Sequence, residues 1–270
     1  MQVHEKLNNL KENIRNMGNL AIAYSGGVDS TFLLKVAHEV LGEKVLAITA
    51  RSSTYPEREF KQSVDFAQQI GANQIVIVSE ELEIDGFSKN PVNRCYFCKK
   101  ELFTKVQEVA REHGISYMAD GSNVDDLGDY RPGMQATSEL EVVSPLRAAG
   151  MTKEDIRILS KEMGLPTWDK PAFACLASRF PYGHDITKEK LEMVDKAEQY
   201  LLDLGFRQVR VRHHGDVARI EVPASDRNRF FDTDLMDKVG GKFKEIGFSY
   251  TALDLKGYRT GSMNEGILGK

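Results

Sequence analysis

A glycine-rich hexapeptide carries the clearest chemical signal in this chain. Residues 25–30 read Ser-Gly-Gly-Val-Asp-Ser and follow the apolar run 20–24, which has the character of a buried strand. Adjacent glycines adopt backbone conformations closed to other residues and let main-chain N–H groups surround an anion. Serine is a favoured helix cap, and we expect Ser30 to cap the helix that follows. The pattern predicts an ATP phosphate site formed by Ser25, Gly26, Gly27, Asp29 and Ser30.

Two aspartates are placed to hold the metal that ATP chemistry requires. Asp29 lies in the hexapeptide, and Asp120 ends a second apolar run at 116–120. Carboxylate oxygens suit Mg²⁺, so we expect both residues to hold that ion, with Gly121 beside the nucleotide. Asp-Gly-Ser-Asn is also an ordinary turn sequence, which is the alternative for Asp120. The roles of Asp125 and Asp126 stay open.

The chain has three cysteines. Cys95 and Cys98 flank a Tyr-Phe pair at the start of a predicted helix, where neighbouring cations and the helix dipole favour thiolates. With Cys175 they make three thiolates and, since no histidine has zinc-ligand spacing to them, a 4Fe-4S cluster with one open iron fits better than structural zinc. A catalytic thiol without a cluster and inert buried cysteines are the alternatives. An odd count without a secretion signal argues against a disulfide framework.

Apolar runs alternate with helical patterns through the first half of the chain, and this alternation predicts an α/β fold with a doubly wound parallel sheet. Nucleotides bind such sheets at the carboxyl ends of the strands, where the hexapeptide and Asp120 both fall. After residue 180 the pattern predicts a smaller α+β domain with helices at 187–204 and 232–246 and strands at 208–213, 217–222 and 248–255. We therefore expect domains at 1–180 and 181–270.

Composition narrows the possible partners. The formal net charge is −4 and the pI is near 5.9, which argues against nucleic acid as a partner. No apolar stretch approaches the roughly 20 residues that span a bilayer, so we expect a cytoplasmic protein without a membrane partner. The adjacent His213 and His214 point to opposite faces of a strand, so they are expected to be surface residues rather than metal ligands.

A set of motifs spread over the chain resembles one known family. SGGVDS resembles the loop of the PP-loop pyrophosphatases, which cut ATP between the α and β phosphates, and it lacks the Gly-Lys-Ser/Thr sequence of kinase-type loops. Together the motifs resemble the LarE family, the ATP-dependent sulfur transferases of nickel-pincer cofactor biosynthesis. The motifs are SGGVDS, the Asp120–Asp126 stretch, Asp129–Gly133, Ser144–Leu146, Cys175–Gly183, Val209–Arg212 and Leu253–Asn264.

The resemblance implies a substrate and roles for further residues. The substrate would be pyridinium-3,5-biscarboxylic acid mononucleotide, whose carboxylates are adenylated and become thiocarboxylates. Sulfur would come from Cys175, sacrificed as in single-cysteine members, or from a sulfide on a cluster held by Cys95, Cys98 and Cys175. Arg179, four residues after Cys175, would act in catalysis by stabilising the acyl oxyanion or the adenylate phosphate, with a local salt bridge as the alternative. Arg210, Arg212 and Arg259 would bind the substrate phosphate, and the alternative for the alternating Arg210 and Arg212 is a solvated strand face.

The resemblance also bears on partners and on rival functions. It implies a homo-oligomer that hands its product to a nickel-insertion protein. A tRNA thiolation enzyme would share the loop and the paired cysteines, but would be expected to add a basic RNA-binding surface. An ammonia-dependent amidating PP-loop enzyme would share the adenylation step without needing the cysteines, and a nucleotide-sensing module would bind ATP without cleaving it.

Overall fold

The computed structural model describes residues 2–128, 132–259 and 261–262. Parts of two sequence motifs, residues 129–131 and residues 260 and 263–264, lie outside these ranges. Internal contacts divide the chain into two compact units: the first comprises Met1–Glu81 and Asn93–Phe173, and the second comprises Leu82–Val92 and Ala174–Lys270. The chain therefore passes between the units three times. The sequence pattern predicts a single passage at residue 180, whereas the contacts group 82–92 and 174–180 with the second unit.

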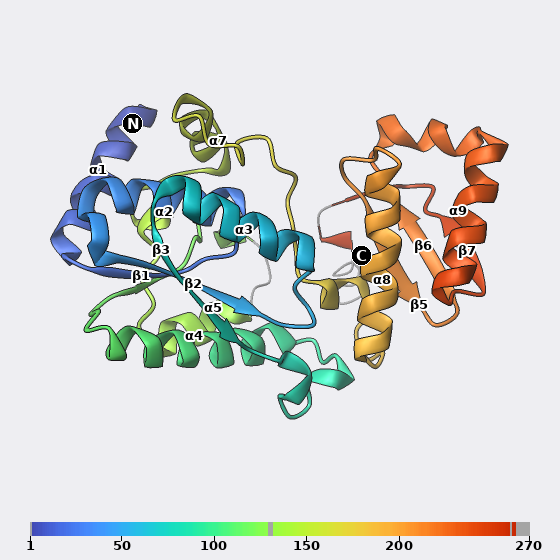
Figure 1. The fold of residues 1–270 in the computed structure, drawn as a ribbon, viewed down its shortest axis with the longest axis horizontal. Helices are drawn as coiled ribbons and strands as arrows, with labels where there is room; N and C mark the ends of the chain where they lie inside the picture. Colours follow the sequence, from blue (N-terminus) through green and yellow to red (C-terminus); the bar gives the residue numbers. More distant parts are fainter. Residues whose placement is uncertain (1, 129–131, 260, 263–270) are drawn as a thin grey trace. The chain divides into compact units, whose positions relative to one another are not determined.

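A four-stranded parallel sheet forms the centre of the first unit, with strand order β3-β2-β1-β4 (Figure 1). Its strands are β1 (Leu20–Ala23), β2 (Val45–Arg51), β3 (Asn73–Val78) and β4 (Met118–Ala119). Neighbouring strands run in the same direction, with Leu20 opposite Val45 and Ile22 opposite Ala119. All of their carboxyl ends therefore meet at one edge, as predicted for a doubly wound sheet.

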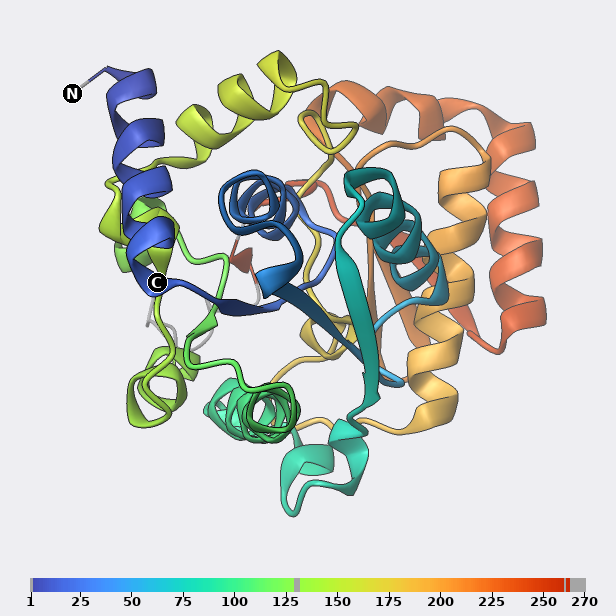
Figure 2. The ribbon, with the colours of Figure 1, turned by 60° about the vertical axis from the view of Figure 1, so that its left-hand side comes forward.

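Helices cover both faces of this sheet. The helices of this unit are α1 (Val3–Met17), α2 (Val28–Leu41), α3 (Glu57–Ile70), α4 (Arg94–Glu112), α5 (Gly133–Glu139), α6 (Pro145–Ala148) and α7 (Lys153–Glu162). Figures 1 and 2 show α4 and α5 on the face opposite α1, α2, α3 and α7. Phe103 and Val106 of α4 pack on Leu46 of the sheet in one cluster, and Phe32 of α2 packs with Ile22 in another. Burial of such side chains stabilises each layer by roughly 1.5–3 kcal/mol per residue.

The second unit is α+β. Its sheet has the order β5-β6-β7, built from β5 (Arg210–His214), β6 (Val217–Glu221) and β7 (Tyr250–Leu253), with β5 antiparallel and β7 parallel to β6. Its helices are α8 (Lys188–Asp203) and α9 (Thr233–Ile246), and the side chains of Thr187 and Asp232 cap them by accepting from first-turn N–H groups. Short 3-10 turns complete the two units: Gly42–Lys44, Glu81–Glu83, Phe87–Lys89, Val124–Gly128, Leu176–Arg179 and Ala224–Phe231.

The predicted fold class is confirmed, and most predicted elements lie within a few residues of their observed bounds. The helix that was expected to begin at the paired cysteines begins at Arg94, and its first turn has a hydrogen bond from Tyr96 N to Asn93 O at 2.9 Å. Cys95 and Cys98 therefore lie within the first turns of α4. Among the residues that the structure describes, no helix is both long and apolar enough to span a bilayer.

The expectation that His213 is a surface residue is wrong, since its exposed fraction is 5%. Its ring stacks on Phe180, with centroids 5.2 Å apart, and lies 5.4 Å from the ring of Phe248. Strand alternation turns His213 toward this aromatic side of the sheet, which the sequence pattern alone does not identify as buried. Burial, with a smaller contribution from the charge of Lys190, lowers the pKa of His213 to about 4.

We expect acid to destabilise the protein through His213. The unfolded chain takes up a proton near pH 6.5 and the folded chain only near pH 4, so the unfolded state binds more protons in between and the free energy of unfolding falls as pH falls through this window. The loss should be on the order of 2 kcal/mol, and a His213→Phe variant should lack it. Urea unfolding at pH 7 and pH 4.5 measures this difference. His4→Gln, at an exposed position, should behave as the parent; an equal acid loss in His213→Phe would contradict the prediction.

Candidate active site

The glycine-rich turn between β1 and α2 has the geometry of an anion-binding loop. Gly26 has a φ of 62°, and a Cβ atom at this position would lie 2.8 Å from the Cβ atom of Ser63 in α3. Only glycine fits this close approach without strain. The Oγ atom of Ser30 contacts the Oγ atom of Ser25 at 3.1 Å and donates to the carbonyl of Gly27 at 3.4 Å, which ties the two ends of the turn together.

The expectation that Ser30 caps α2 is wrong, because the helix begins at Val28 and its N-cap residue is Gly27. Glycine has no side chain to cover the first-turn N–H groups, which have no partner within the helix. The positive end of the α2 dipole adds to these donors. The helix start can therefore offer its N–H groups to a phosphate, as the sequence pattern predicted.

Each of the two aspartates that were predicted to hold Mg²⁺ forms an ion pair with a lysine. The Nζ atom of Lys153, the first residue of α7, lies 2.5 Å from the Oδ2 atom of Asp29. The Nζ atom of Lys99 lies 3.5 Å from the Oδ2 atom of Asp120. Asn123 donates to the other oxygen of Asp29 at 3.4 Å. Cations and carboxylates thus alternate at the carboxyl edge of the sheet.

Asp120 also organises the turn that follows β4. Its Oδ1 atom accepts from Ser122 N at 3.1 Å and from the Ser144 hydroxyl at 2.7 Å. Gly121 packs so closely on α2 that an added Cβ would lie 3.1 Å from the nitrogen of Ser30. This contact brings the end of β4 beside the phosphate loop. Asp120 therefore both stabilises the turn after β4 and lies close to the phosphate loop.

The two residues whose roles were open make local contacts. Asp125 accepts from the main-chain N–H of Lys153 at 2.7 Å, at the start of α7. Asp126 accepts from the main-chain N–H of Asn123 at 2.9 Å. Both carboxylates thus support the backbone that carries Asn123 and Lys153 toward Asp29.

One of the paired cysteines, Cys98, contacts a buried carboxyl group. Cys95 and Cys98 are three residues apart on α4 and so share one side of the helix. The Sγ atom of Cys98 donates to Glu81 Oε1 at 3.7 Å, while Glu81 Oε2 is buried and has no hydrogen-bond partner among the described residues. Burial raises the pKa of Glu81, although the nearby hydroxyl groups of Ser52 and Thr54 oppose the shift. All three cysteines are partly buried and none forms a disulfide.

In the second unit, an arginine holds the main chain around Cys175. Arg179 is fully buried, and its guanidinium binds both carboxylate oxygens of Glu198, at 2.8 and 2.9 Å. It also donates to the carbonyl oxygens of Ala174 at 2.8 Å and Cys175 at 3.2 Å. Burial favours a neutral carboxyl at Glu198, yet the adjacent guanidinium holds the pKa of Glu198 below its usual value. Burial disfavours the charged guanidinium, yet the carboxylate of Glu198 raises the pKa of Arg179 above its usual value, with a smaller contribution from Cys175.

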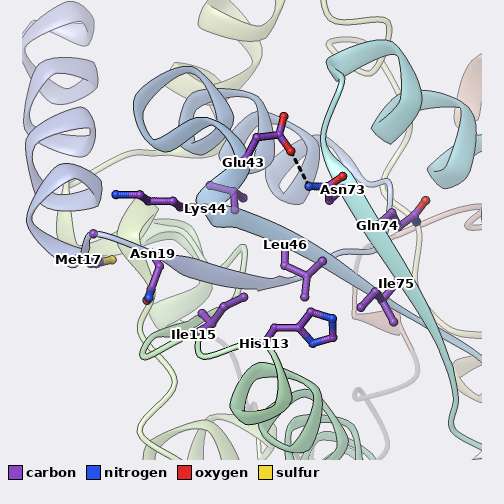
Figure 3. A pocket seen from close by; sticks show the side chains of 12 residues that line it. Met17, Asn19, Glu43, Lys44, Leu46, Asn73, Gln74, Ile75, His113 and Ile115 are labelled. Atoms are coloured by element: carbon purple, nitrogen blue, oxygen red, sulfur yellow. Dashed lines mark hydrogen bonds between the residues drawn. The ribbon is translucent and has the colours of Figure 1, made fainter.

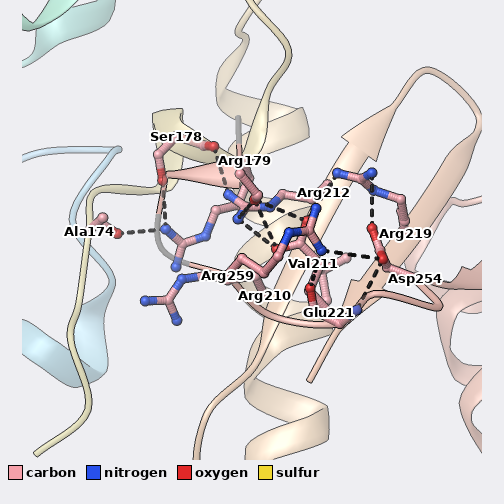
Figure 4. A network of polar contacts seen from close by, with 12 residues as sticks. Ala174, Ser178, Arg179, Arg210, Val211, Arg212, Arg219, Glu221, Asp254 and Arg259 are labelled. Carbon is pink, nitrogen blue, oxygen red and sulfur yellow. Dashed lines mark hydrogen bonds and ion pairs between the residues drawn. The ribbon is translucent and has the colours of Figure 1, made fainter. Parts of the chain in front are cut away.

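The predicted phosphate-binding arginines lie on one charged face of the β5-β6-β7 sheet (Figure 4). Arg212 donates to Glu221 Oε2 at 2.7 Å and to the carbonyl of Ser178 at 3.0 Å, while its buried Nε atom has no hydrogen-bond partner in the described part of the chain. Arg210 lies over the ring of Tyr258, and burial lowers the pKa of Arg210 to about 10. Arg259 donates to the carbonyl of Gly257 at 2.9 Å. This arginine face is therefore joined to the Cys175 turn through Ser178 and Arg179.

A separate cavity of about 800 Å³ opens at the opposite edge of the first sheet, at the amino ends of β1, β2 and β3 (Figure 3). Several of its polar side chains are bound within the protein. Asn73 donates to Glu43 at 2.7 Å, Asn19 donates to the carbonyl of Gly114 at 3.2 Å, and the His113 ring contacts the carbonyl of Val109. The cavity lies away from the strand ends that bind nucleotides.

Comparison with known proteins agrees with this geometry. Residues 2–118 match the NAD synthase family model. The chain is 44% identical to the uncharacterized protein slr1717 of Synechocystis, over 97% of this chain and 98% of that protein. It is 38% identical to the pyridinium-3,5-bisthiocarboxylic acid mononucleotide synthase of Lactiplantibacillus plantarum, over 93% of this chain and 91% of the synthase.

The chain belongs to the LarE family. It is an ATP-using enzyme with a PP-loop, as the hexapeptide predicted. A glutamine-hydrolyzing GMP synthase of Dehalococcoides mccartyi is 23% identical over 73% of this chain and 40% of that synthase. This weaker match covers only part of each protein, while the match to the LarE synthase runs through both units.

The described residues fit the predicted Mg²⁺ site and the predicted 4Fe-4S cluster differently. Within the described residues, no group of three or more histidine, cysteine or acidic side chains is assembled for a metal ion. Mg²⁺ needs fewer protein ligands, because one or two carboxylates and substrate phosphates usually hold it. The oxygen atoms of Asp29 and Asp120 fit that requirement. Cys95 and Cys98 supply two thiols on one helix face, and Cys175 belongs to the other unit.

Sequence reasoning missed several residues of these sites. They are Lys99, Lys153, Glu198 and Glu221. A signal existed for Lys153, because a lysine in the first turn of a helix opposes the helix dipole and so suggests a local partner. A signal also existed for Glu198, which occupies the apolar stripe of α8 seven residues after the buried Leu191.

We expect a Gly26→Ala variant to lose ATP binding. The added Cβ would lie 2.8 Å from Ser63 in a backbone conformation that alanine disfavours. The resulting strain of about 1–3 kcal/mol should lower the affinity for ATP about 10- to 100-fold. Calorimetric titration with a non-hydrolysable ATP analogue measures the affinity. Gly18→Ala is the matched control, because Gly18 has a φ of 76° with nothing near its missing Cβ. Equal affinities of the two variants would contradict the prediction.

Proposed function

We propose that this protein is an ATP-dependent sulfur transferase that converts the carboxylates of pyridinium-3,5-biscarboxylic acid mononucleotide to thiocarboxylates. The observation that carries the proposal is the 38% identity to a named bisthiocarboxylic acid mononucleotide synthase along 93% of the chain. The Cys175 turn next to an arginine face supports it, since sulfur transfer to an anionic nucleotide needs both a thiol and a phosphate clamp.

In the proposed first step, a substrate carboxylate oxygen attacks the α phosphorus of ATP. The bond to the bridging oxygen of the β phosphate breaks, and pyrophosphate leaves with the electron pair. The turn at Ser25–Ser30 would hold the phosphates, and Lys153 and Lys99 would move from Asp29 and Asp120 to the developing negative charge. Mg²⁺ held by the two aspartates would neutralise the leaving group. The product is an acyl-adenylate.

In the proposed second step, the Cys175 thiolate attacks the acyl carbon and AMP leaves. Removal of the Cα proton of Cys175 then breaks its Cβ–S bond, which releases the thiocarboxylate and leaves dehydroalanine. Arg179 would favour the thiolate by its charge and fix the turn by its bonds to the carbonyls of Ala174 and Cys175. Arg210, Arg212 and Arg259 would bind the substrate phosphate, and the Nε atom of Arg212, which has no hydrogen-bond partner among the described residues, would be one donor for it.

Cys95 and Cys98 support a second source of sulfur. Together with Cys175, they would hold a 4Fe-4S cluster, which supplies a sulfide at its open iron when bound. In this version Cys175 survives the reaction. The product would pass to a nickel-insertion protein, and the enzyme would act as a homo-oligomer.

Amidation is the competing chemistry, because residues 2–118 match the NAD synthase family. That match covers the nucleotide-binding part that both classes need for adenylation, and it stops before Cys175 and the arginine face. Incubation with ATP and the biscarboxylate nucleotide separates the two. The proposal requires AMP, pyrophosphate and a thiocarboxylate product; formation of AMP only with ammonia, yielding an amide, would replace it.

Lys153→Met should slow pyrophosphate release about 100-fold or more. Loss of one hydrogen-bond donor at a developing negative charge costs roughly 2.7–4 kcal/mol of transition-state stabilisation. A coupled pyrophosphate assay measures the rate. The control is Lys6→Met, since Lys6 makes an ion pair of equal length, 2.5 Å, with Asp155 of the same helix α7. A Lys153 variant that keeps the parent rate would exclude this lysine from phosphate binding.

Cys175→Ser should still release pyrophosphate within about 10-fold of the parent rate but form no thiocarboxylate, because adenylation precedes attack by sulfur. Cys95→Ser with Cys98→Ser distinguishes the two sulfur sources. If Cys175 is sacrificed, this double variant still gives one product per chain and each chain loses the mass of H₂S. If the cluster supplies sulfur, anaerobically reconstituted parent protein holds about four irons and the double variant holds none. Thiocarboxylate formation by Cys175→Ser would contradict both routes.

A further inference from the structure

Lys170 joins three parts of the first unit at one point. Its Nζ atom lies 2.7 Å from the Oε2 atom of Glu59 in α3 and donates to the Oε1 atom of Gln62 at 2.8 Å. The same ammonium donates to the carbonyl oxygen of Gly26, in the phosphate loop, at 3.2 Å. The side chains of Lys170 and Glu59 are 13% and 12% exposed. This ammonium is therefore a largely buried junction rather than a surface charge.

Lys170 belongs to a segment, residues 165–173, that we call the strap. Arg157 of α7 holds the strap by donating to the carbonyls of Trp168 at 2.6 Å and Lys170 at 2.8 Å. At the end of the strap, the ring of Phe173 lies edge-on to that of Tyr55, with centroids 6.2 Å apart. Two residues later, the chain reaches Cys175.

The strap and its neighbour Tyr55 fix the direction of the phosphate loop. The Tyr55 hydroxyl donates to the carbonyl of Ser25 at 2.7 Å, and Lys170 donates to the carbonyl of Gly26. In a planar trans peptide, the carbonyl and the following N–H point in opposite directions. The N–H group of Gly26 therefore points away from the Tyr55 hydroxyl, and the N–H group of Gly27 points away from the Lys170 ammonium, so both are left to bind an anion.

We propose that Lys170 is a positioning residue that couples ATP in the loop to order in the strap that leads to Cys175. This inference rests on the proposed function for its chemical purpose. A phosphate that accepts hydrogen bonds from the Gly26 and Gly27 N–H groups stabilises the peptide orientation that Lys170 holds. Linkage then requires the converse, so an ordered strap raises the affinity for ATP by the same factor. Order in the strap limits the positions open to the sulfur-bearing residue once adenylation begins.

Lys170→Met tests the coupling while keeping the aliphatic part of the side chain. Hydrogen exchange by mass spectrometry reports on the strap peptide, with and without a non-hydrolysable ATP analogue. In the parent, the analogue should slow exchange of the strap at least about 3-fold; in Lys170→Met it should not slow exchange, and affinity for the analogue should fall about 10-fold. Lys170→Arg should restore part of the protection. Lys35→Met is the control, because Lys35 pairs with Glu39 within α2.

A second readout follows the chemistry. With substrate and ATP, Lys170→Met should yield at least about 10-fold fewer thiocarboxylates per pyrophosphate than the parent. Equal protection of the strap by the analogue in parent and Lys170→Met would overturn the inference. If the parent makes no thiocarboxylate, the proposed function fails, but the exchange data still decide the coupling.

Phe173→Ala covers the case in which Lys170→Met does not fold, because it loosens the other end of the strap and leaves Lys170 in place. The analogue should then protect residues near Lys170 but no longer those near residue 173. Unchanged protection along the whole strap in this variant would also overturn the inference.

Discussion

The close approach of the Ser25–Ser30 turn to α3 constrains the whole nucleotide site. Gly26 leaves no room for a Cβ against Ser63, so the turn has one position relative to α3. That position sets the direction of α2 and the place of Asp29 at its start. It also brings the carbonyls of Ser25 and Gly26 within reach of Tyr55 and Lys170. A turn held by packing on one side and by hydrogen bonds on the other offers preorganised N–H groups, which lose little freedom when phosphate binds.

Buried charge plays the corresponding part in the second unit. Taking Arg179 and Glu198 out of water costs several kcal/mol per ion, and the pair recovers this only with good geometry and further hydrogen bonds. Glu198 meets the requirement by also accepting from Val211 N at 3.0 Å, and Arg179 by donating to two carbonyls. The pair thereby fixes the Cys175 turn to both α8 and β5. A hydrophobic pair could stabilise the unit equally well, but it would not direct the main chain at Cys175.

The sequence predicted the parts of the site that depend on local pattern. The strand, turn and helix around Ser25–Ser30 follow from apolar runs and glycines, and the alternation of elements specifies the parallel sheet. Contacts between segments that are distant in the sequence could not be predicted from local pattern. Lys153 contacts Asp29, which lies 124 residues away in the sequence, and Lys99 contacts Asp120, which lies 21 residues away. The burial of His213 depends on which face of β5 meets Phe180 and Phe248, and strand alternation leaves that choice open.

At the start of α7, the groups that stabilise the helix differ from the group that supplies positive charge to the site. A lysine at the first helical position opposes the dipole by about 0.3–1 kcal/mol. The chain offsets this with acidic groups that bind the same turn: Asp125 accepts from Lys153 N, and Asp155 completes a capping box with Thr152. The helix start is thus stabilised by its own main-chain contacts, so the Lys153 ammonium is not needed there. The ammonium instead contacts Asp29, and an incoming phosphate can replace Asp29 as its partner without unwinding the helix.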